Sequence, residues 1–368
     1  MTMKNPIPLD PIPLIRDFFH TAKQQKNRPL SLNPQDYQTI KSILDNQSHP
    51  AFNAQSIANL LLALAYRRTR WAALLNKELD RPLLHAIAQN ADRFNPQDIA
   101  NTLWALATMG INWRDIQEKE LDNSLLKAIA QNANRFNPQD IANTLWALAT
   151  MGINWRDIQE KELDNSLLKA IAQNANRFNP QDIANTLWAL ATMGINWRDI
   201  QEKELDNSLL KAIAQNANRF NPQDIANTLW ALATMGINWR DIQEKELDNS
   251  LLKAIAQNAN RFNPQDIANT LWALATMGIN WRYVQENGSH LSLVHVIARN
   301  YNQFALKGAI QIMWAVLWFD IQLPENVLQH LKTVIASSKQ PQSSRLHQRF
   351  AKLLARKVTL PFHNEYPI

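Results

Sequence analysis

The stretch Asn137-Pro-Gln-Asp-Ile-Ala-Asn-Thr-Leu-Trp-Ala-Leu-Ala-Thr-Met-Gly decides the fold of this 368-residue chain. It opens a 42-residue unit, NPQDIANTLWALATMGINWRDIQEKELDNSLLKAIAQNANRF, which starts at Asn95 and recurs unchanged from Asn137, Asn179 and Asn221. A fifth copy starts at Asn263 and follows the unit as far as Arg282. Because a fixed period of this length is typical of stacked-repeat proteins, the repeat has to be interpreted before any other pattern.

The first half of the unit predicts a helix with a defined start and end, which we call helix B. Asn137 has a side chain suited to the N-cap, and Pro138 suits the first helical position because its missing N–H is not needed there. Gly152 is expected to stop the helix in a left-handed conformation, after about Met151. On the helical wheel, the core face consists of Ile141, Leu145, Leu148 and Ala149.

The second half of the unit predicts a second long helix, helix A, after a short charged helix or turn that begins at Asn154. We expect helix A to run from Ser166 to about Asn176, with Asp164 or Asn165 as its cap. Its apolar side chains recur at helical spacing and form one face: Leu167, Leu168, Ile171, Ala175 and Phe178.

Neither helix can bury its apolar face alone, so neighbouring units must stack. The sequence therefore predicts an all-α fold, a right-handed α-solenoid superhelix of tandem 42-residue repeats with helical caps at both ends. We place an N-terminal cap at residues 1–52, the repeats at 53–322 with the identical units from 95 to 282, and a basic C-terminal cap at 323–368. Within the caps, helices are expected at 10–47, 324–337 and 343–357.

The net charge of +6 is concentrated at the two ends of the chain. Residues 1–94 contain 12 basic and 7 acidic residues, and residues 323–368 contain 7 and 2. Each full repeat contains 4 basic and 5 acidic residues. A nucleic-acid-binding array usually gains much of its affinity from phosphate contacts, so the slightly acidic repeats argue against purely electrostatic binding.

Composition argues against catalysis and against a membrane location. The chain has no cysteine, and its eight histidines lie outside the identical units without metal-ligand spacing, so we expect no cofactor and no metal. Identical units supply copies of one surface rather than the varied groups of an active site, so we expect no enzyme. No signal peptide or membrane-length apolar run is visible, which suggests a cytoplasmic monomer or an effector delivered into a host cell.

One ridge of helix B carries the candidate binding residues, at positions i, i+4, i+7 and i+11 from Gln139. Amides can pair with base edges or peptide backbone, and an indole can stack on a base or cover an aliphatic side chain. Alternatively, each Trp packs on the next repeat and each Asn binds loop backbone. The candidates are Asn101, Asn143, Asn185, Asn227, Asn269, Trp104, Trp146, Trp188, Trp230, Trp272, Gln139, Gln181, Gln223, Thr150, Thr192 and Thr234.

Helix A exposes basic side chains that could contact phosphates, although they could equally form a solvated face. These candidates are Lys127, Lys169, Lys211, Lys253, Arg135, Arg177, Arg219 and Arg261. A second tryptophan follows helix B in the connector, and we interpret it as part of the core. Its copies are Trp113, Trp155, Trp197, Trp239 and Trp281.

The run from Phe136 to Gly152 resembles the core of the octotricopeptide repeat, and the Leu-Leu-Lys-Ala-Ile-Ala before it resembles the other helix of that repeat. This resemblance covers roughly residues 52–321 and implies a helical-repeat protein that binds RNA. The unit is also similar to the 42-residue SKWP repeats of plant-pathogen effectors, which are HEAT/armadillo-like. Trp-Ala-Leu-Ala-Thr resembles the third helix of armadillo repeats, which implies a groove for an extended peptide, although Thr150 stands where that motif has Asn.

Two functions remain open from the sequence. The first is binding of single-stranded RNA along the concave face, with a homopolymeric preference because identical units would meet the same base. The second is a protein-interaction scaffold that grips an extended peptide. A continuous basic strip in the groove would favour RNA, whereas an uncharged Asn/Trp groove would favour a peptide.

Overall fold

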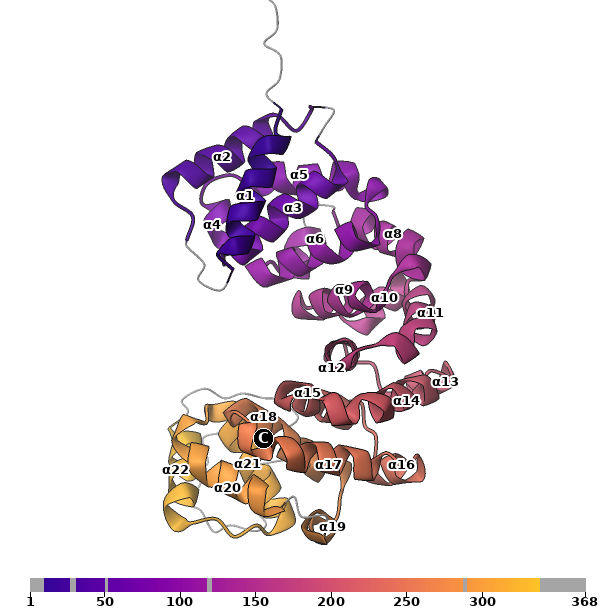
Figure 1. Cartoon of the computed structure of the whole chain (residues 1–368), viewed down its shortest axis with the longest axis vertical. Coiled ribbons are helices and arrows are strands. Elements are labelled where there is room, and N and C mark those ends of the chain that lie inside the picture. The colour runs from indigo at the N-terminus through magenta and orange to yellow at the C-terminus, as the bar shows by residue number, and fades with distance from the viewer. Residues whose placement is uncertain (1–9, 27–30, 50–51, 118–120, 287–289, 338–368) are drawn as a thin grey trace, which may run out of the picture. The chain divides into compact units, whose positions relative to one another are not determined.

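The computed structural model describes residues 10–26, 31–49, 52–117, 121–286 and 290–337. These residues form α-helices and short 3-10 turns, with no strand among them. They divide into two units, one ending at Ile195 and one beginning at Asn196, and each is described by itself below (Figure 1). The predicted helix at 343–357 lies outside the described residues.

Each repeat contributes a B helix, a short connector helix and an A helix, and the tandem repeats form an all-α solenoid. The B helices are α3 (Ala54–Tyr66), α6 (Pro96–Met109), α9 (Pro138–Thr150), α12 (Pro180–Thr192), α15 (Pro222–Thr234), α18 (Pro264–Met277) and α21 (Leu306–Phe319). The connector helices are α4 (Trp71–Leu75), α7 (Trp113–Gln117), α10 (Trp155–Glu160), α13 (Trp197–Glu202), α16 (Trp239–Glu244) and α19 (Trp281–Glu286). The A helices are α5 (Asp80–Asn90), α8 (Asp122–Asn132), α11 (Asp164–Asn174), α14 (Asp206–Asn216), α17 (Asp248–Asn258) and α20 (His290–Asn300).

The B helices begin as the sequence predicts. In α9, the Asn137 side chain accepts a hydrogen bond from the backbone N–H of Asp140, and the Asp140 carboxylate accepts one from the backbone N–H of Asn137. This reciprocal capping box satisfies two N–H groups that a helix start otherwise leaves unpaired. At the other end, Gly152 has φ of +87°, in the left-handed region that glycine adopts without strain.

The A helices begin differently from the prediction. We expected Asp164 or Asn165 to cap α11, but the helix already includes both, and its N-cap is Leu163 in a right-handed helical conformation without a side-chain hydrogen bond. The chain enters α11 from the left-handed residue Glu162, so backbone geometry sets the start of the helix. The C-terminal end also differs, because α11 stops at Asn174 and continues as a 3-10 turn over residues 175–177.

The core lies between the two helical layers and between repeats. The predicted core face of α9 is fully buried, with Ile141, Leu145 and Leu148 each 0% exposed. The predicted apolar face of helix A is buried as well, from Leu167 to Phe178. Since burying one such side chain contributes about 1.5–3 kcal/mol, the repeated faces dominate the stability of the stack.

Within each unit the B helices pack more closely than the A helices. Each B helix lies along the next one, as α6 does on α9, and α15 on α18. An A helix instead contacts the 3-10 turn of the previous repeat, as α11 does at residues 133–135. The B helices therefore form the more closely packed layer of each unit.

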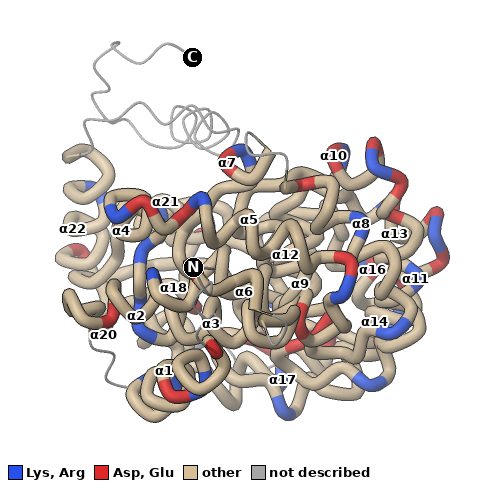
Figure 2. The backbone as a smooth tube through the Cα atoms, turned by 90° about the horizontal axis from the view of Figure 1, so that it is seen from above, with Lys and Arg blue, Asp and Glu red and all other residues tan. Residues whose placement is uncertain are grey.

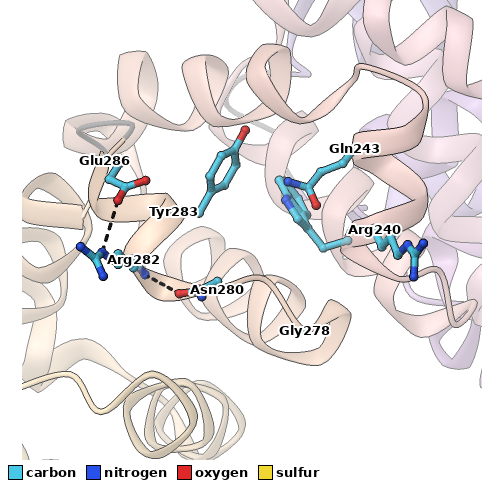
Figure 3. A pocket seen from close by; sticks show the side chains of 8 residues that line it. Arg240, Gln243, Gly278, Asn280, Arg282, Tyr283 and Glu286 are labelled. Carbon is cyan, nitrogen blue, oxygen red and sulfur yellow. Dashed lines mark hydrogen bonds and ion pairs between the residues drawn. The ribbon is translucent and has the colours of Figure 1, made fainter.

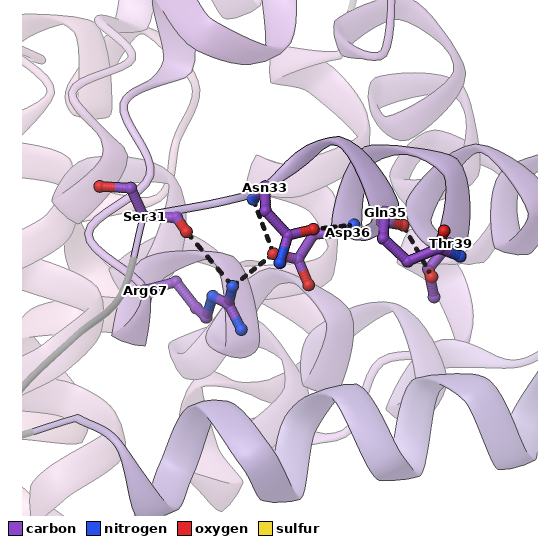
Figure 4. A network of polar contacts seen from close by, with 6 residues as sticks. All are labelled: Ser31, Asn33, Gln35, Asp36, Thr39 and Arg67. Atoms are coloured by element: carbon purple, nitrogen blue, oxygen red, sulfur yellow. Dashed lines mark hydrogen bonds and ion pairs between the residues drawn. The ribbon is translucent and has the colours of Figure 1, made fainter.

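The two predicted helices of the N-terminal cap are α1 (Ile12–Gln24) and α2 (Pro34–Asp45), and the described C-terminal helix is α22 (Glu325–Ala336). A buried arginine attaches α2 to the first B helix (Figure 4). The Arg67 guanidinium donates to the carboxylate of Asp36, which also caps α2, and to the backbone oxygen of Ser31. This contact ties the start of α2 to the end of α3.

Candidate functional site: the ridge of the B helices

Four side chains per repeat form a polar and aromatic ridge on the solvent-accessible side of the B helices, which we call the B ridge. In α9 these are Gln139, Asn143, Trp146 and Thr150. The glutamine and threonine are exposed, whereas the asparagine and tryptophan are half-buried. The same pattern holds at every identical copy, except that Thr276 is half-buried. Within each unit, the predicted B-helix residues are therefore at least partly accessible to solvent.

The ridge asparagines of four repeats have unpaired amides. Among the described residues, no hydrogen-bond partner within the chain is found for the side chains of Asn101, Asn143, Asn185 and Asn227. The alternative that these asparagines satisfy loop backbone is therefore wrong for these four. Asn269 differs, because its Oδ1 accepts from Gln265 Nε2 at 2.8 Å and from Gln311 Nε2 at 3.1 Å.

The ridge aromatics contact one another within each unit. In the first unit, the rings of Tyr66 and Trp104 lie 6.0 Å apart. In the second unit, Trp230 and Trp272 lie 6.5 Å apart, and Lys307 Nζ lies 5.9 Å from the Trp230 ring. Such spacing is within the range of favourable aromatic contacts, so these two pairs join neighbouring repeats at the ridge.

The ridge is uncharged in the identical repeats. Its positions hold only Gln, Asn, Trp and Thr, and the nearby acidic residue of each B helix is the capping-box aspartate. Burial raises the pKa of these carboxyl groups, and the hydrogen bond from the N-cap backbone partly opposes this rise. We call them the capping aspartates: Asp98, Asp140, Asp182, Asp224 and Asp266.

The connector tryptophans belong to the core, as predicted. Trp113, Trp155, Trp197 and Trp239 are 3–5% exposed. Trp281 is only half-buried, and its ring stacks on Phe319 with the ring centroids 4.7 Å apart. The ridge tryptophans and the connector tryptophans therefore occupy clearly different environments.

The structure does not bring the predicted phosphate contacts to the B ridge. Lys127, Lys169, Lys211 and Lys253 are exposed on the A helices, as are the arginines of the 3-10 turns, Arg135, Arg177, Arg219 and Arg261. Lys169 lines a groove of about 260 Å³ with Gln131, Asn134, Ser166 and Gln173, and every residue lining it belongs to an A helix or its turn. Figure 2 shows basic positions along α11, α14 and α17, and both signs of charge on α10 and α13.

Sequence reasoning missed a buried asparagine at the end of each A helix. Asn132 is 6% exposed, and its amide donates to Ala128 O at 3.0 Å and to Phe94 O of the preceding repeat at 3.3 Å. The Arg135 guanidinium donates to its Oδ1. The sequence pattern that could have revealed Asn132 is its spacing, because it lies seven residues after the core residue Leu125 and therefore on the same face of the helix. We call this set the seam asparagines: Asn132, Asn174, Asn216 and Asn258.

No cluster of three or more metal-ligating side chains is found in the part of the chain that the structure describes. Within the same residues, none of the helices has the length and apolar character needed to cross a membrane.

Comparison with known proteins identifies the repeat at the level of the family. The family model described as "Protein of unknown function (DUF1601)" matches seven successive segments: residues 20–61, 69–103, 109–145, 151–187, 193–229, 235–271 and 277–308. No curated protein matches the chain. In the identical region each match spans a connector, an A helix and the first part of the next B helix, so it includes a ridge asparagine and ends one residue before the ridge tryptophan. Since the matched segments cover most of its length, the chain belongs to the DUF1601 family of tandem-repeat proteins.

Proposed function

We propose that the array is a binding scaffold that holds an extended polypeptide along the B ridge. The observation that carries this proposal is the uncharged set of unpaired amides, Asn101, Asn143 and Asn185 in the first unit and Asn227 in the second, each on the same helix as a half-buried ridge tryptophan.

An extended peptide offers the groups that this ridge lacks. Each asparagine amide has two donors and an acceptor oxygen, which suit the C=O and N–H groups of a peptide backbone. The indoles supply apolar surface for side-chain stems. Packed helices lie about 8–10 Å apart and an extended chain advances about 3.3 Å per residue, so each repeat would span about three peptide residues.

Single-stranded RNA suits the B ridge less well. Nucleic-acid affinity depends largely on neutralising phosphates, and the identical repeats place no cation on the ridge. Their lysines and arginines lie on the A helices instead. A peptide needs no such neutralisation, so the neutral ridge favours the peptide.

RNA binding is the second candidate, and the groove around Lys169 favours it on a different surface. Its amides and its lysine could contact a sugar-phosphate backbone along the A helices. The resemblance to octotricopeptide repeats also supports this candidate. In either case we propose a binding protein without catalytic activity, because each repeat presents the same groups.

The test is a selection of displayed random peptides on the full chain, followed by affinity measurements with two variants. The ridge variant replaces the four unpaired asparagines with alanine: Asn101, Asn143, Asn185 and Asn227. The matched control replaces one lysine per repeat with alanine: Lys127, Lys169, Lys211 and Lys253. Both sets are outside the hydrophobic core, so the melting temperature should stay close to that of the parent.

We expect selected peptides to lose affinity for the ridge variant and to keep it for the lysine control. The same proteins are titrated with the four RNA homopolymers. If no peptide is selected, while an RNA homopolymer binds and loses affinity in the lysine control, the peptide proposal is wrong and RNA binding on the A helices replaces it.

A further inference from the structure

A repeated backbone hydrogen bond joins a connector helix to the end of the next B helix. The backbone N–H of Trp113 donates to Met151 O at 2.7 Å, and that of Trp155 donates to Met193 O at 2.8 Å. In the second unit, Trp197 donates to Met235 O, also at 2.8 Å. Each bond fixes a connector helix against the end of the next B helix and closes the seam between two repeats.

The seam between α16 and α18 lacks this bond. Both residues are described, yet the N–H of Trp239 is not bonded to Met277 O. Here α18 continues to Met277, whereas α15 ends at Thr234. In addition, the indole Nε1 of Trp239 is buried and has no hydrogen-bond partner among the described atoms. A buried unpaired donor is costly, so the indole lowers the stability of this seam.

The sequence diverges at the same seam. The connector reads WRYVQE in α19 instead of WRDIQE, so Tyr283 stands where the other copies have an aspartate. Without that carboxylate, Asn280 accepts from the backbone N–H of Arg282 at 2.9 Å. The Tyr283 hydroxyl donates to the carboxylate of Asp248 at the start of α17, which fixes the ring across the seam.

A pocket of about 390 Å³ opens at this seam (Figure 3). Its lining comes from two connector helices and the end of a B helix: Trp239, Arg240, Gln243, Gly278, Asn280, Arg282, Tyr283 and Glu286. Figure 3 shows Gln243 and the Tyr283 ring on facing sides of the pocket, with Arg240 beside the former and Arg282 beside the latter. The volume is in the range of pockets that hold small molecules.

The lining combines three kinds of group. The Tyr283 ring offers an aromatic face, and Gln243 and Asn280 offer amides. The guanidinium groups of Arg240 and Arg282 are exposed, and each is paired with a glutamate four residues later, which for Arg282 is the lining residue Glu286. A phosphate would compete with these exposed glutamates for the arginines. An aromatic face stacks on a planar base, amides pair with base edges, and arginine binds phosphate strongly. We infer that this pocket binds a nucleotide, with its base on Tyr283 and its phosphate at the arginine rim.

The test is calorimetric titration of the full chain with adenosine 5′-monophosphate, adenosine and inorganic phosphate. We expect one saturable site per chain for the nucleotide, with weaker binding of adenosine and of phosphate. The double variant Tyr283→Asp, Val284→Ile restores the sequence of the other connectors, so it should fold, and it removes the aromatic wall on which the base would stack. We expect its affinity for the nucleotide to fall by about tenfold or more.

Arginine variants separate this pocket from binding elsewhere on the surface. Arg282→Ala should weaken nucleotide binding, whereas Arg198→Ala should not, although both side chains are exposed and both pair with a glutamate four residues later. Absence of saturable nucleotide binding would refute the inference, as would unchanged affinity in the double variant. Phosphate binding as tight as nucleotide binding would show that the base makes no contact.

Discussion

The repeats that begin at Asn137, Asn179 and Asn221 each contain two helix ends of the same geometry but with different residues at the left-handed position. After α9, Gly152 N–H donates to Ala149 O and Ile153 N–H to Leu148 O. After α10, Glu162 N–H donates to Gln159 O and Leu163 N–H to Ile158 O. Both are Schellman motifs, but Gly152 has φ of +87° and Glu162 has φ of +56°. A side chain at the second position is strained, so glycine there should stabilise the protein.

The size of the effect follows from two opposing terms. The left-handed conformation costs an L-residue about 1–2 kcal/mol. Glycine removes that cost, but it also increases the entropy of the unfolded chain, which destabilises the folded state by about 0.5–1 kcal/mol. We therefore expect about 0.5–1 kcal/mol of stabilisation per site, and about 2 kcal/mol for the triple replacement of Glu162, Glu204 and Glu246 if the distant sites are additive.

The assay is urea and thermal unfolding of the triple Glu→Gly variant beside the parent. The matched control makes the same substitution two residues earlier, at Glu160, Glu202 and Glu244, where the backbone is helical. There glycine should destabilise by about 1 kcal/mol per site through lost helix propensity, with a small addition from the exposed ion pair to arginine. If both variants lose stability equally, the left-handed assignment is wrong.

Two further predictions concern the polar groups of the stack. Replacing a seam asparagine, as in Asn132→Ala, should lower the free energy of urea unfolding by about 1–3 kcal/mol, because it leaves the Phe94 carbonyl without its partner. The control Asn134→Ala changes an exposed side chain and should alter stability little, so equal effects of the two variants would contradict the seam role. Burial raises the pKa of the capping aspartates above the ordinary 3.8, so their contribution to stability is present below that pH and is lost as the pH rises through their folded pKa. A variant with all five changed to asparagine should therefore gain stability relative to the parent as pH rises above about 4, and a constant difference in urea midpoint across that range would contradict the shift.

The parts of the fold that the sequence predicted correctly depend on local chemistry. The start of α9 follows from Asn137, Pro138 and Asp140, which act on one another within a single turn. The left-handed end at Gly152 follows from the conformational freedom of glycine. The buried faces follow from spacing alone, because identical units must bury the same face in every copy.

The features that the sequence did not reveal depend on the neighbouring repeat or on an unfavoured conformation. Glu162 has no propensity for the left-handed region, so the start of α11 at Asp164 could not be predicted from its residues. The role of Asn132 appears only when Phe94 of the preceding repeat lies beside it. The sequence placed amides and tryptophans on the B ridge and cations on helix A, but only the packing separates these two surfaces.

The most direct test of the central claim is oxidative labelling of tryptophan in the folded chain, read by mass spectrometry. Trypsin releases a peptide of the same sequence from every identical copy. In the copy that begins at Asn137, this peptide is Phe136–Arg156, and it contains both the ridge residue Trp146 and the connector residue Trp155. Each peptide thus carries its own internal control. If the B ridge is the binding surface, the ridge tryptophan is oxidised much faster than the connector tryptophan, and a selected peptide ligand protects the ridge position alone. Equal oxidation of the two tryptophans, or a ligand that leaves the ridge position unprotected, would contradict it.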